Sequence, residues 1–314
     1  MESRGVRPTA VTVALVILGA GLGAQAPAGG QGAQAPGRGN NDVQVAANKL
    51  APNFYALQAN GLSTVGVLVG PDGVLMVDSG TAALTEKIVA AIKTVSDRPI
   101  RFMINTHLHP DHTGGNENFG KMGVTILARD QLRARLAKPN PAPGGAAATP
   151  SPAAALPLVT YDAPLTFHMN GEDVAAIPVV KAHTDGDTMV RFPVSDVIMT
   201  GDFYRSAGYP NIDRNNGGSF DGMIRGLNTI VELAGPNTRI VPGHGAIVDE
   251  KAVIAHRDLA MALRDRVAAL VKKGQTLEQI LATKPTAEFD AGVPQAGTTG
   301  ERFIGQLYAE VGGK

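Results

Sequence analysis

Short apolar runs that end in glycine, aspartate or histidine recur along the chain from about Val43 onward. Runs of this length, rich in β-branched residues and bounded by turn formers, are typical of buried strands. Pro71-Asp72-Gly73, between the first two runs, has the chemistry of a hairpin turn. The predicted strands are Thr64–Val69, Val74–Val77, Ile100–Ile104, Val124–Leu127, Val174–Val180, Thr188–Phe192, Asp196–Thr200 and Arg239–Val241.

Apolar residues at helical spacing follow several of these runs. Thr81–Val95 carries such a stripe through Leu84, Ile88 and Ile92, which predicts an amphipathic helix. Because strands precede helices in each half of the chain, we expect an α/β fold with two sheets packed face to face and helices outside. A further helix is predicted to begin within Gly114–Phe119. The remaining predicted helices cover Arg129–Ala137, Phe220–Ala234, Asp249–Lys273 and Glu301–Val311, and Gly274 ends the third of them.

The N-terminal segment lacks this pattern. Arg4 and Arg7 precede the apolar stretch Ala10–Leu22 and then Ala24-Gln25-Ala26, an arrangement typical of a secretory signal. We predict a signal peptide over 1–26, a flexible Gly/Pro/Ala-rich tether over 27–42 and one folded domain over 43–314. A periplasmic or secreted location follows, with no stable membrane span after signal removal; an uncleaved membrane anchor is the alternative.

Within the predicted domain, residues 138–158 are almost wholly proline, alanine, glycine and serine. This composition favours a flexible insertion, which is either a flap beside the functional site or a plain disordered excursion.

Composition narrows the function further. The 28 Lys and Arg residues balance 28 Asp and Glu residues, so nothing favours nucleic acid or an anionic membrane surface as partner. With 44% apolar residues, the chain can bury a sizeable core. It has no cysteine and so forms no disulfide. A small-molecule substrate is the expected partner, and the oligomeric state is left open.

His107-Leu108-His109-Pro110-Asp111-His112 holds four metal-capable side chains directly after an apolar run. Residues two apart on an extended segment point to the same side, so His107 and His109 can converge on one cation. Pro110 turns the chain, and Asp111 and His112 can then face a second, adjacent cation. Imidazole and carboxylate ligands suit zinc, and two such ions form a hydrolytic site; iron and manganese accept the same ligands.

Three further ligand types stand at the ends of apolar runs. His183 follows Val179-Val180, Asp202 follows Gly201, and His244 lies between two glycines. Glycine lets the backbone turn sharply and approach an ion closely. His168, which no turn follows, and His256, in the middle of a predicted helix, lack this context and are expected to be structural or surface residues.

The chain resembles the metallo-β-lactamase superfamily in the order and spacing of its candidate ligands, His107-x-His109-x-Asp111-His112, His183, Asp202 and His244. Val77-Asp78-Ser79-Gly80 also resembles the aspartate-containing turn of that family. The resemblance implies an αββα sandwich with the site at one edge between the sheets. It also implies that His107, His109 and His183 hold one metal, that Asp111, His112 and His244 hold the other, and that Asp202 bridges both. Asp78 would support the ligands from behind.

Asp202 resembles the bridging aspartate of glyoxalase II-like and lactonase-like members, whereas members that hydrolyse β-lactams use cysteine or serine nearby. His183-Thr184-Asp185-Gly186-Asp187 departs from the His-Thr-Pro-Gly-His of many glyoxalase II-like members. Predicted export favours a β-lactam substrate instead, because drugs directed at the cell wall act outside the cytoplasm. The hypothesis is therefore an exported enzyme with two zinc ions that hydrolyses a small ester, thioester, lactone or amide; a periplasmic β-lactamase is the alternative.

In this hypothesis a metal-bridging hydroxide is the nucleophile, and Asp111 orients it or passes a proton. The loop after Asp202 offers candidate substrate contacts at Tyr204, Arg205, Tyr209 and Asn211, although the polarity of a solvent-exposed loop explains these residues equally well. A serine hydrolase is disfavoured because no Gly-x-Ser-x-Gly occurs and Ser79 belongs to an Asp-Ser-Gly turn. A non-catalytic metal-binding scaffold is less favoured, because all seven ligands are present.

Overall fold

The structure is a computed structural model that describes residues 43–59, 62–139, 149–294 and 297–313. A seven-stranded sheet is built from the first part of the folded domain. Its first four strands pair antiparallel and the last four pair parallel. Their order in the sheet follows the sequence: β1 (Ala46–Ala51), β2 (Phe54–Gln58), β3 (Val65–Leu68), β4 (Val74–Val77), β5 (Ile100–Ile104), β6 (Thr125–Arg129) and β7 (Val159–Tyr161).

A second, five-stranded sheet follows along the chain. All its neighbours pair antiparallel except β11 and β12, which are parallel. The strand order is β12 (Arg239–Pro242), β11 (Val197–Gly201), β10 (Asp187–Phe192), β9 (Glu172–Val179) and β8 (Leu165–Met169). Both sheets are therefore mixed, which confirms the predicted fold class.

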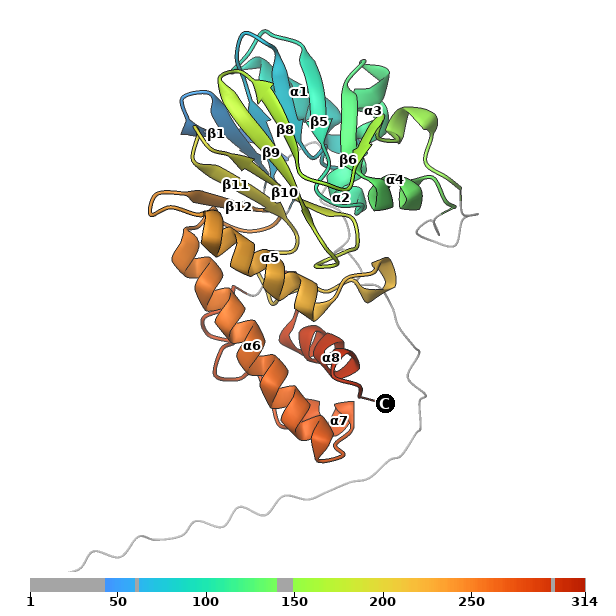
Figure 1. The fold of residues 1–314 in the computed structure, drawn as a ribbon, viewed down its shortest axis with the longest axis vertical. Helices are drawn as coiled ribbons and strands as arrows, with labels where there is room; N and C mark the ends of the chain where they lie inside the picture. The colour runs from blue at the N-terminus through green and yellow to red at the C-terminus, as the bar shows by residue number, and fades with distance from the viewer. Residues whose placement is uncertain (1–42, 60–61, 140–148, 295–296, 314) are drawn as a thin grey trace, which may run out of the picture. The chain divides into compact units, whose positions relative to one another are not determined.

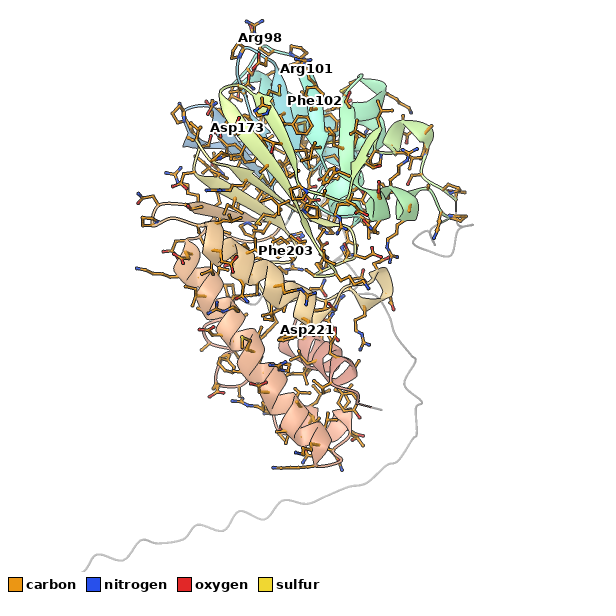
Figure 2. The ribbon with its side chains drawn as sticks, viewed as in Figure 1. Arg98, Arg101, Phe102, Asp173, Phe203 and Asp221 are labelled. Atoms are coloured by element: carbon orange, nitrogen blue, oxygen red, sulfur yellow. The ribbon has the colours of Figure 1, made fainter. Side chains whose placement is uncertain are left out.

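Apolar side chains fill the space between the two sheets. Phe54 of the first sheet meets Phe192 of the second with ring centroids 4.6 Å apart, and both residues are fully buried. Phe102 of β5, labelled in Figure 2, meets Phe167 of β8 in the same way at 5.6 Å. Aromatic pairs at these separations add to the burial of apolar area, which is the main force holding the sheets together.

Helices cover the outer face of each sheet (Figure 1). On the first sheet, Leu84, Ile88, Ile92 and Phe119 bury their side chains against β3 to β6. On the second, Phe203, labelled in Figure 2, belongs to a core shared with the C-terminal helices. The helices are η2 (Ala82–Leu84), α1 (Thr85–Lys93), α2 (Pro110–Thr113), α3 (Asn116–Lys121), α4 (Asp130–Leu136), η3 (Ala153–Ala155), η4 (Arg214–Asn216), α5 (Phe220–Leu233), α6 (Glu250–Lys272), α7 (Leu277–Ala282) and α8 (Gly300–Glu310).

The predicted strands and helices are all found, with ends shifted by a few residues. The predicted elements do not include β1, β2, β7, β8, α7 or the short helices α2, η3 and η4. At β8 the error is specific, because a turn does follow His168: Asn170 and Gly171 have φ of 57° and 77° and join β8 to β9. Asn-Gly with two positive φ angles is the favoured two-residue hairpin connection.

The predicted signal and tether, residues 1–42, lie outside the described residues and remain predictions. So does 140–148 of the predicted flexible insertion. Its described remainder is attached to the body: Ala155 is buried, η3 packs against α3, and Ser151 N donates to Leu136 O at 2.9 Å. Among the residues that the structure describes, no helix is both long and apolar enough to cross a membrane.

Candidate metal centre

The predicted ligands all follow the carboxyl ends of strands at one edge of the sandwich. Asp78 follows β4, the His cluster follows β5, His183 follows β9, Asp202 follows β11 and His244 follows β12. The two sheets are tied together there by Thr188 N of β10, which donates to Thr106 O at 2.8 Å. Side chains placed at strand ends are held by a rigid scaffold, as catalytic geometry requires.

The first group of side chains consists of His107, His109 and His183, whose ligand-type atoms all lie within 4.8 Å of one another. His109 Nδ1 and His183 Nε2 are 2.9 Å apart. His107 Nε2 is buried and has no hydrogen-bond partner among the described residues. Three imidazole nitrogens converging on one point, one of them buried and unpaired, fit a zinc-type ion.

The second group consists of Asp111, His112 and His244, again within 4.8 Å of one another. His244 Nε2 lies 2.9 Å from Asp111 Oδ2, and His112 Nε2 lies 3.5 Å from the same oxygen. Pro110 begins α2, and this short turn places His112 beside the first group, with the His107 and His112 ring centroids 4.1 Å apart.

Asp202 lies between the two groups. Its Oδ1 is 3.4 Å from His112 Nε2, and its Oδ2 is 3.4 Å from His244 Nε2 and 4.0 Å from His183 Nε2. Oδ1 is buried without a hydrogen-bond partner among the described residues. A buried carboxylate oxygen without a donor is costly in a protein interior unless a cation is bound. The donor set, with Asp202 between the two groups, therefore fits divalent cations of the zinc type.

Asp78 supports both groups from behind. Its carboxylate is 2.7 Å from each of Thr106 N, Thr106 Oγ1 and His112 Nδ1. Thr106 Oγ1 also lies 3.1 Å from His107 Nδ1, so a hydrogen-bond chain runs from His107 through Thr106 to Asp78. These contacts fix which ring nitrogen of each histidine faces the centre.

The two groups differ in charge. Burial, with cationic His112 nearby, lowers the pKa of His107 well below its usual value, and burial with His109 nearby lowers the pKa of His183 to about 4. His107 and His183 are therefore neutral at pH 7. In the second group, burial opposes charge, but Asp202 and Asp111 outweigh it and raise the pKa of His244 to about 9. Likewise, the hydrogen bond from His244 outweighs burial and lowers the pKa of Asp111 to about 2.

All seven predicted ligands thus meet in one centre, and His168 lies apart from it. Its exposed side chain bonds Asp173 at 2.7 Å. His256, in α6, packs its ring edge-on against Tyr204, and its Nε2 is buried.

The four candidate substrate contacts lie in different surroundings in the structure. Tyr204 and Tyr209 are each only 1% exposed, so they pack inside the fold and are neither the candidate substrate contacts nor the exposed loop residues that the sequence allowed. The Tyr209 hydroxyl points to the C-terminal segment, where it donates to Asp290 Oδ1 at 2.6 Å. Asn211 supports His183, whose Nδ1 donates to the Asn211 carbonyl at 2.8 Å. Arg205 is the member of the set that reaches the centre, with Nη1 3.7 Å from Asp202 Oδ2.

Asp213 also supports the centre, although the sequence did not mark it as a site residue. Its Oδ2 lies 2.8 Å from His109 Nε2, and the same residue caps η4. It stands in the loop after β11, 104 residues from His109, without a neighbouring ligand motif. The only local signal is its position before a short turn, which is typical of any capping aspartate.

An αββα sandwich with a buried His and Asp centre at one edge defines the class as a metallohydrolase fold. Residues 60–244, more than half of the chain, match the family model of the metallo-beta-lactamase superfamily, and the chain belongs to that superfamily. It is accordingly a hydrolase with a candidate metal-binding cluster, as predicted.

Solved structures support the fold. The stereoselective inverting sec-alkylsulfatase Pisa1 from Pseudomonas sp. has a TM-score of 0.65 at 17% identity, covering 86% of this chain and 50% of its own. A metallo-beta-lactamase from Pontibacter korlensis has a TM-score of 0.57 at 18% identity, covering 68% of this chain and 99% of its own. A metallo-beta-lactamase from Cronobacter sakazakii has a TM-score of 0.58 at 20% identity, and the match covers 74% of this chain and 97% of the Cronobacter chain.

A sequence match was also found with the linear primary-alkylsulfatase of Pseudomonas sp. (strain ATCC 19151). It is 35% identical over 54 residues, which is 17% of this chain. The match spans only a tenth of that curated relative's length.

Proposed function

We propose that the protein is an exported hydrolase with two zinc ions that acts on a small ester, thioester, lactone or amide. The observation that carries the proposal is the position of Asp202, with one oxygen beside His112 and the other between His244 and His183. The first group would hold one ion and the second group the other. When bound, two such ions lower the pKa of water and polarise the scissile bond.

Asp111 is the proposed proton-handling residue. Among the carboxylates of the centre it is the more accessible, with 31% of its side chain exposed against 5% for Asp202. Its low pKa keeps it ionised at neutral pH, so a carboxylate oxygen is ready to accept a hydrogen bond from attacking water. In this role Asp111 orients the nucleophile and receives its proton at Oδ1 or Oδ2.

Arg205 would place a fixed positive charge beside Asp202. Its guanidinium Nε is buried and has no partner among the described residues. A cation held at the edge of the centre favours substrates that carry or develop negative charge.

Hydrolysis of an alkyl sulfate ester is the second candidate function. It is favoured because both the curated sequence match and the Pisa1 structure are alkylsulfatases, and Pisa1 covers more of this chain than the two β-lactamases do. A β-lactam substrate is the remaining alternative.

The test is a panel of substrates given to the zinc-loaded protein: a lactone, a thioester, a carboxylic ester, an alkyl sulfate and nitrocefin. We expect hydrolysis of one class to depend on Asp202 and to be lost in Asp202→Ala and His107→Ala. His168→Ala is the matched control, because this exposed histidine lies outside the centre. Full activity of the metal-free protein, or of Asp202→Ala, would refute the proposal.

Export is tested separately. Cell fractionation followed by N-terminal sequencing should recover a chain that begins near residue 27 outside the cytoplasm. Recovery of the intact N-terminus in the cytoplasm would contradict it.

A further inference from the structure

The loop after β11 supplies the outer hydrogen-bond partner of two of the three histidines in the first group. His183 Nδ1 donates to Asn211 O, and His109 Nε2 meets Asp213 Oδ2, each at 2.8 Å. The loop is bonded back in turn, because Asp213 N donates to His183 O at 2.9 Å. A short segment, 211–213, thus orients both rings so that His183 Nε2 and His109 Nδ1 face each other.

This segment is held in place from the C-terminal helix. Gln306 of α8 accepts a hydrogen bond from Ile212 N at 3.0 Å through Oε1 and donates through Nε2 to Asn211 Oδ1 at 2.9 Å. Both ends of one amide side chain are therefore used on two neighbouring residues. Such a two-point contact fixes position and direction together, which a single hydrogen bond does not.

Other contacts make the attachment firm. Gly208 N donates to Pro294 O at 2.7 Å and Tyr209 N donates to Thr298 O at 2.8 Å. The Tyr209 ring stacks on Phe303, which is fully buried in α8. Helix α8 packs in turn against α6 (Figure 1). The loop that orients the first group therefore rests on the C-terminal helices.

We propose that Gln306 is a positioning residue of the first metal site, through which α8 sets the orientation of His183 and His109. The inference rests on the proposed function, because it requires that the first group binds an ion. Gln306 itself does not touch the centre: it bonds Asn211 and Ile212, and so acts through the segment 211–213. The C-terminal helices are then part of the machinery that shapes the site.

The experiment measures zinc affinity at the first site alone. In a His244→Ala background, which removes one ligand from the second group, chelator competition is compared for Gln306→Leu, Gln306→Glu and Asp213→Asn. Leucine removes both hydrogen bonds. Glutamate keeps the acceptor for Ile212 N and loses the donor to Asn211. Arg302→Ala, an exposed position on the same helix, is the control.

We expect Asp213→Asn to weaken zinc binding about 10- to 100-fold, as is typical of an outer partner of a ligand histidine. Gln306→Leu, one step further out, should weaken it about 5-fold, with Gln306→Glu between that value and the parent. Arg302→Ala should leave the affinity unchanged. Thermal unfolding of each metal-free variant shows whether the fold is retained.

Unchanged zinc affinity in Gln306→Leu, with the parent still binding zinc, would overturn the inference. A lowered unfolding temperature without any loss of affinity would also overturn it, because Gln306 would then be purely structural. A wild-type chain that binds no zinc would instead overturn the proposed function itself.

Discussion

Replacing Asp78 by asparagine tests how the second group is supported. Asp78 has a positive φ of 63°, a conformation that asparagine adopts more readily than most residues, so the backbone should be retained. The new amide can still accept from Thr106 N through one oxygen. Its NH₂ group then faces His112 Nδ1 and Thr106 Oγ1, two atoms that donate to the native carboxylate.

The magnitude follows from burial. Asp78 and His112 are 1% and 0% exposed and lie 2.7 Å apart, so their ion pair is shielded from water. Removing one partner of a buried pair destabilises a protein by about 3 to 5 kcal/mol. We expect the metal-free variant to lose about 3 kcal/mol of unfolding free energy. Loss of an outer partner should weaken metal binding at the second group about 10- to 100-fold. The first group, reached only through Thr106 and His107, should weaken less.

The assay combines urea unfolding of the metal-free protein with chelator competition for each bound zinc. Asp173→Asn is the matched control, because Asp173 also bonds a histidine at 2.7 Å but on the exposed surface, where the cost should stay below about 0.5 kcal/mol. A second zinc that binds Asp78→Asn within threefold of wild type would refute this reasoning.

Three further outcomes are expected. Burial lowers the pKa of His256 to about 4, whereas the pKa of a histidine in the unfolded chain is about 6.5. The unfolded state therefore binds the proton first, and the free energy of unfolding should fall by up to about 3 kcal/mol as pH drops from 6.5 to 4. His256→Leu should flatten that part of a pH series of urea melts, and an unchanged slope would argue against it. Gly243→Ala puts a Cβ 2.1 Å from Asp202 Oδ1 and 3.0 Å from His112 Cε1. The activity of the zinc-loaded protein should therefore fall about 100-fold. Near-wild-type turnover would show that the added methyl group does not displace these side chains. Zinc at about a thousand times its Kd should raise the unfolding temperature by about 10 °C over EDTA-treated protein, and coincident melting curves would show that the folded state has no preferred metal site.

The meeting of the seven candidate ligands in one centre could be predicted because each stands beside a local signal. The His cluster follows an apolar run, and Asp202 and His244 follow glycines at strand ends. The fold class followed for the same reason, since buried strands read as continuous apolar runs. Two short missed elements also left traces: Asn170-Gly171 marks the β8–β9 turn, and Thr276 with Gln279 forms a capping box at the start of α7.

Apart from Asp78, the residues that support the candidate ligands could not be predicted in this way. Asp213 meets His109 across 104 residues, and Gln306 meets Ile212 across 94. Contacts of that kind depend on how the loop after β11 and helix α8 pack, and no local pattern encodes them. The burial of Tyr204 and Tyr209 was missed for the same reason: the loop appears polar in sequence but lies beneath the C-terminal helices.

Metal content shows whether the centre around Asp202 holds two ions. The protein, purified without chelator and dialysed against metal-free buffer, is analysed by inductively coupled plasma mass spectrometry, alongside Asp202→Ala and His168→Ala. We expect close to two zinc ions per chain in wild type and His168→Ala, and substantially fewer in Asp202→Ala. Equal metal content in wild type and Asp202→Ala, or none in wild type after incubation with zinc, would contradict a centre in which Asp202 joins two ions.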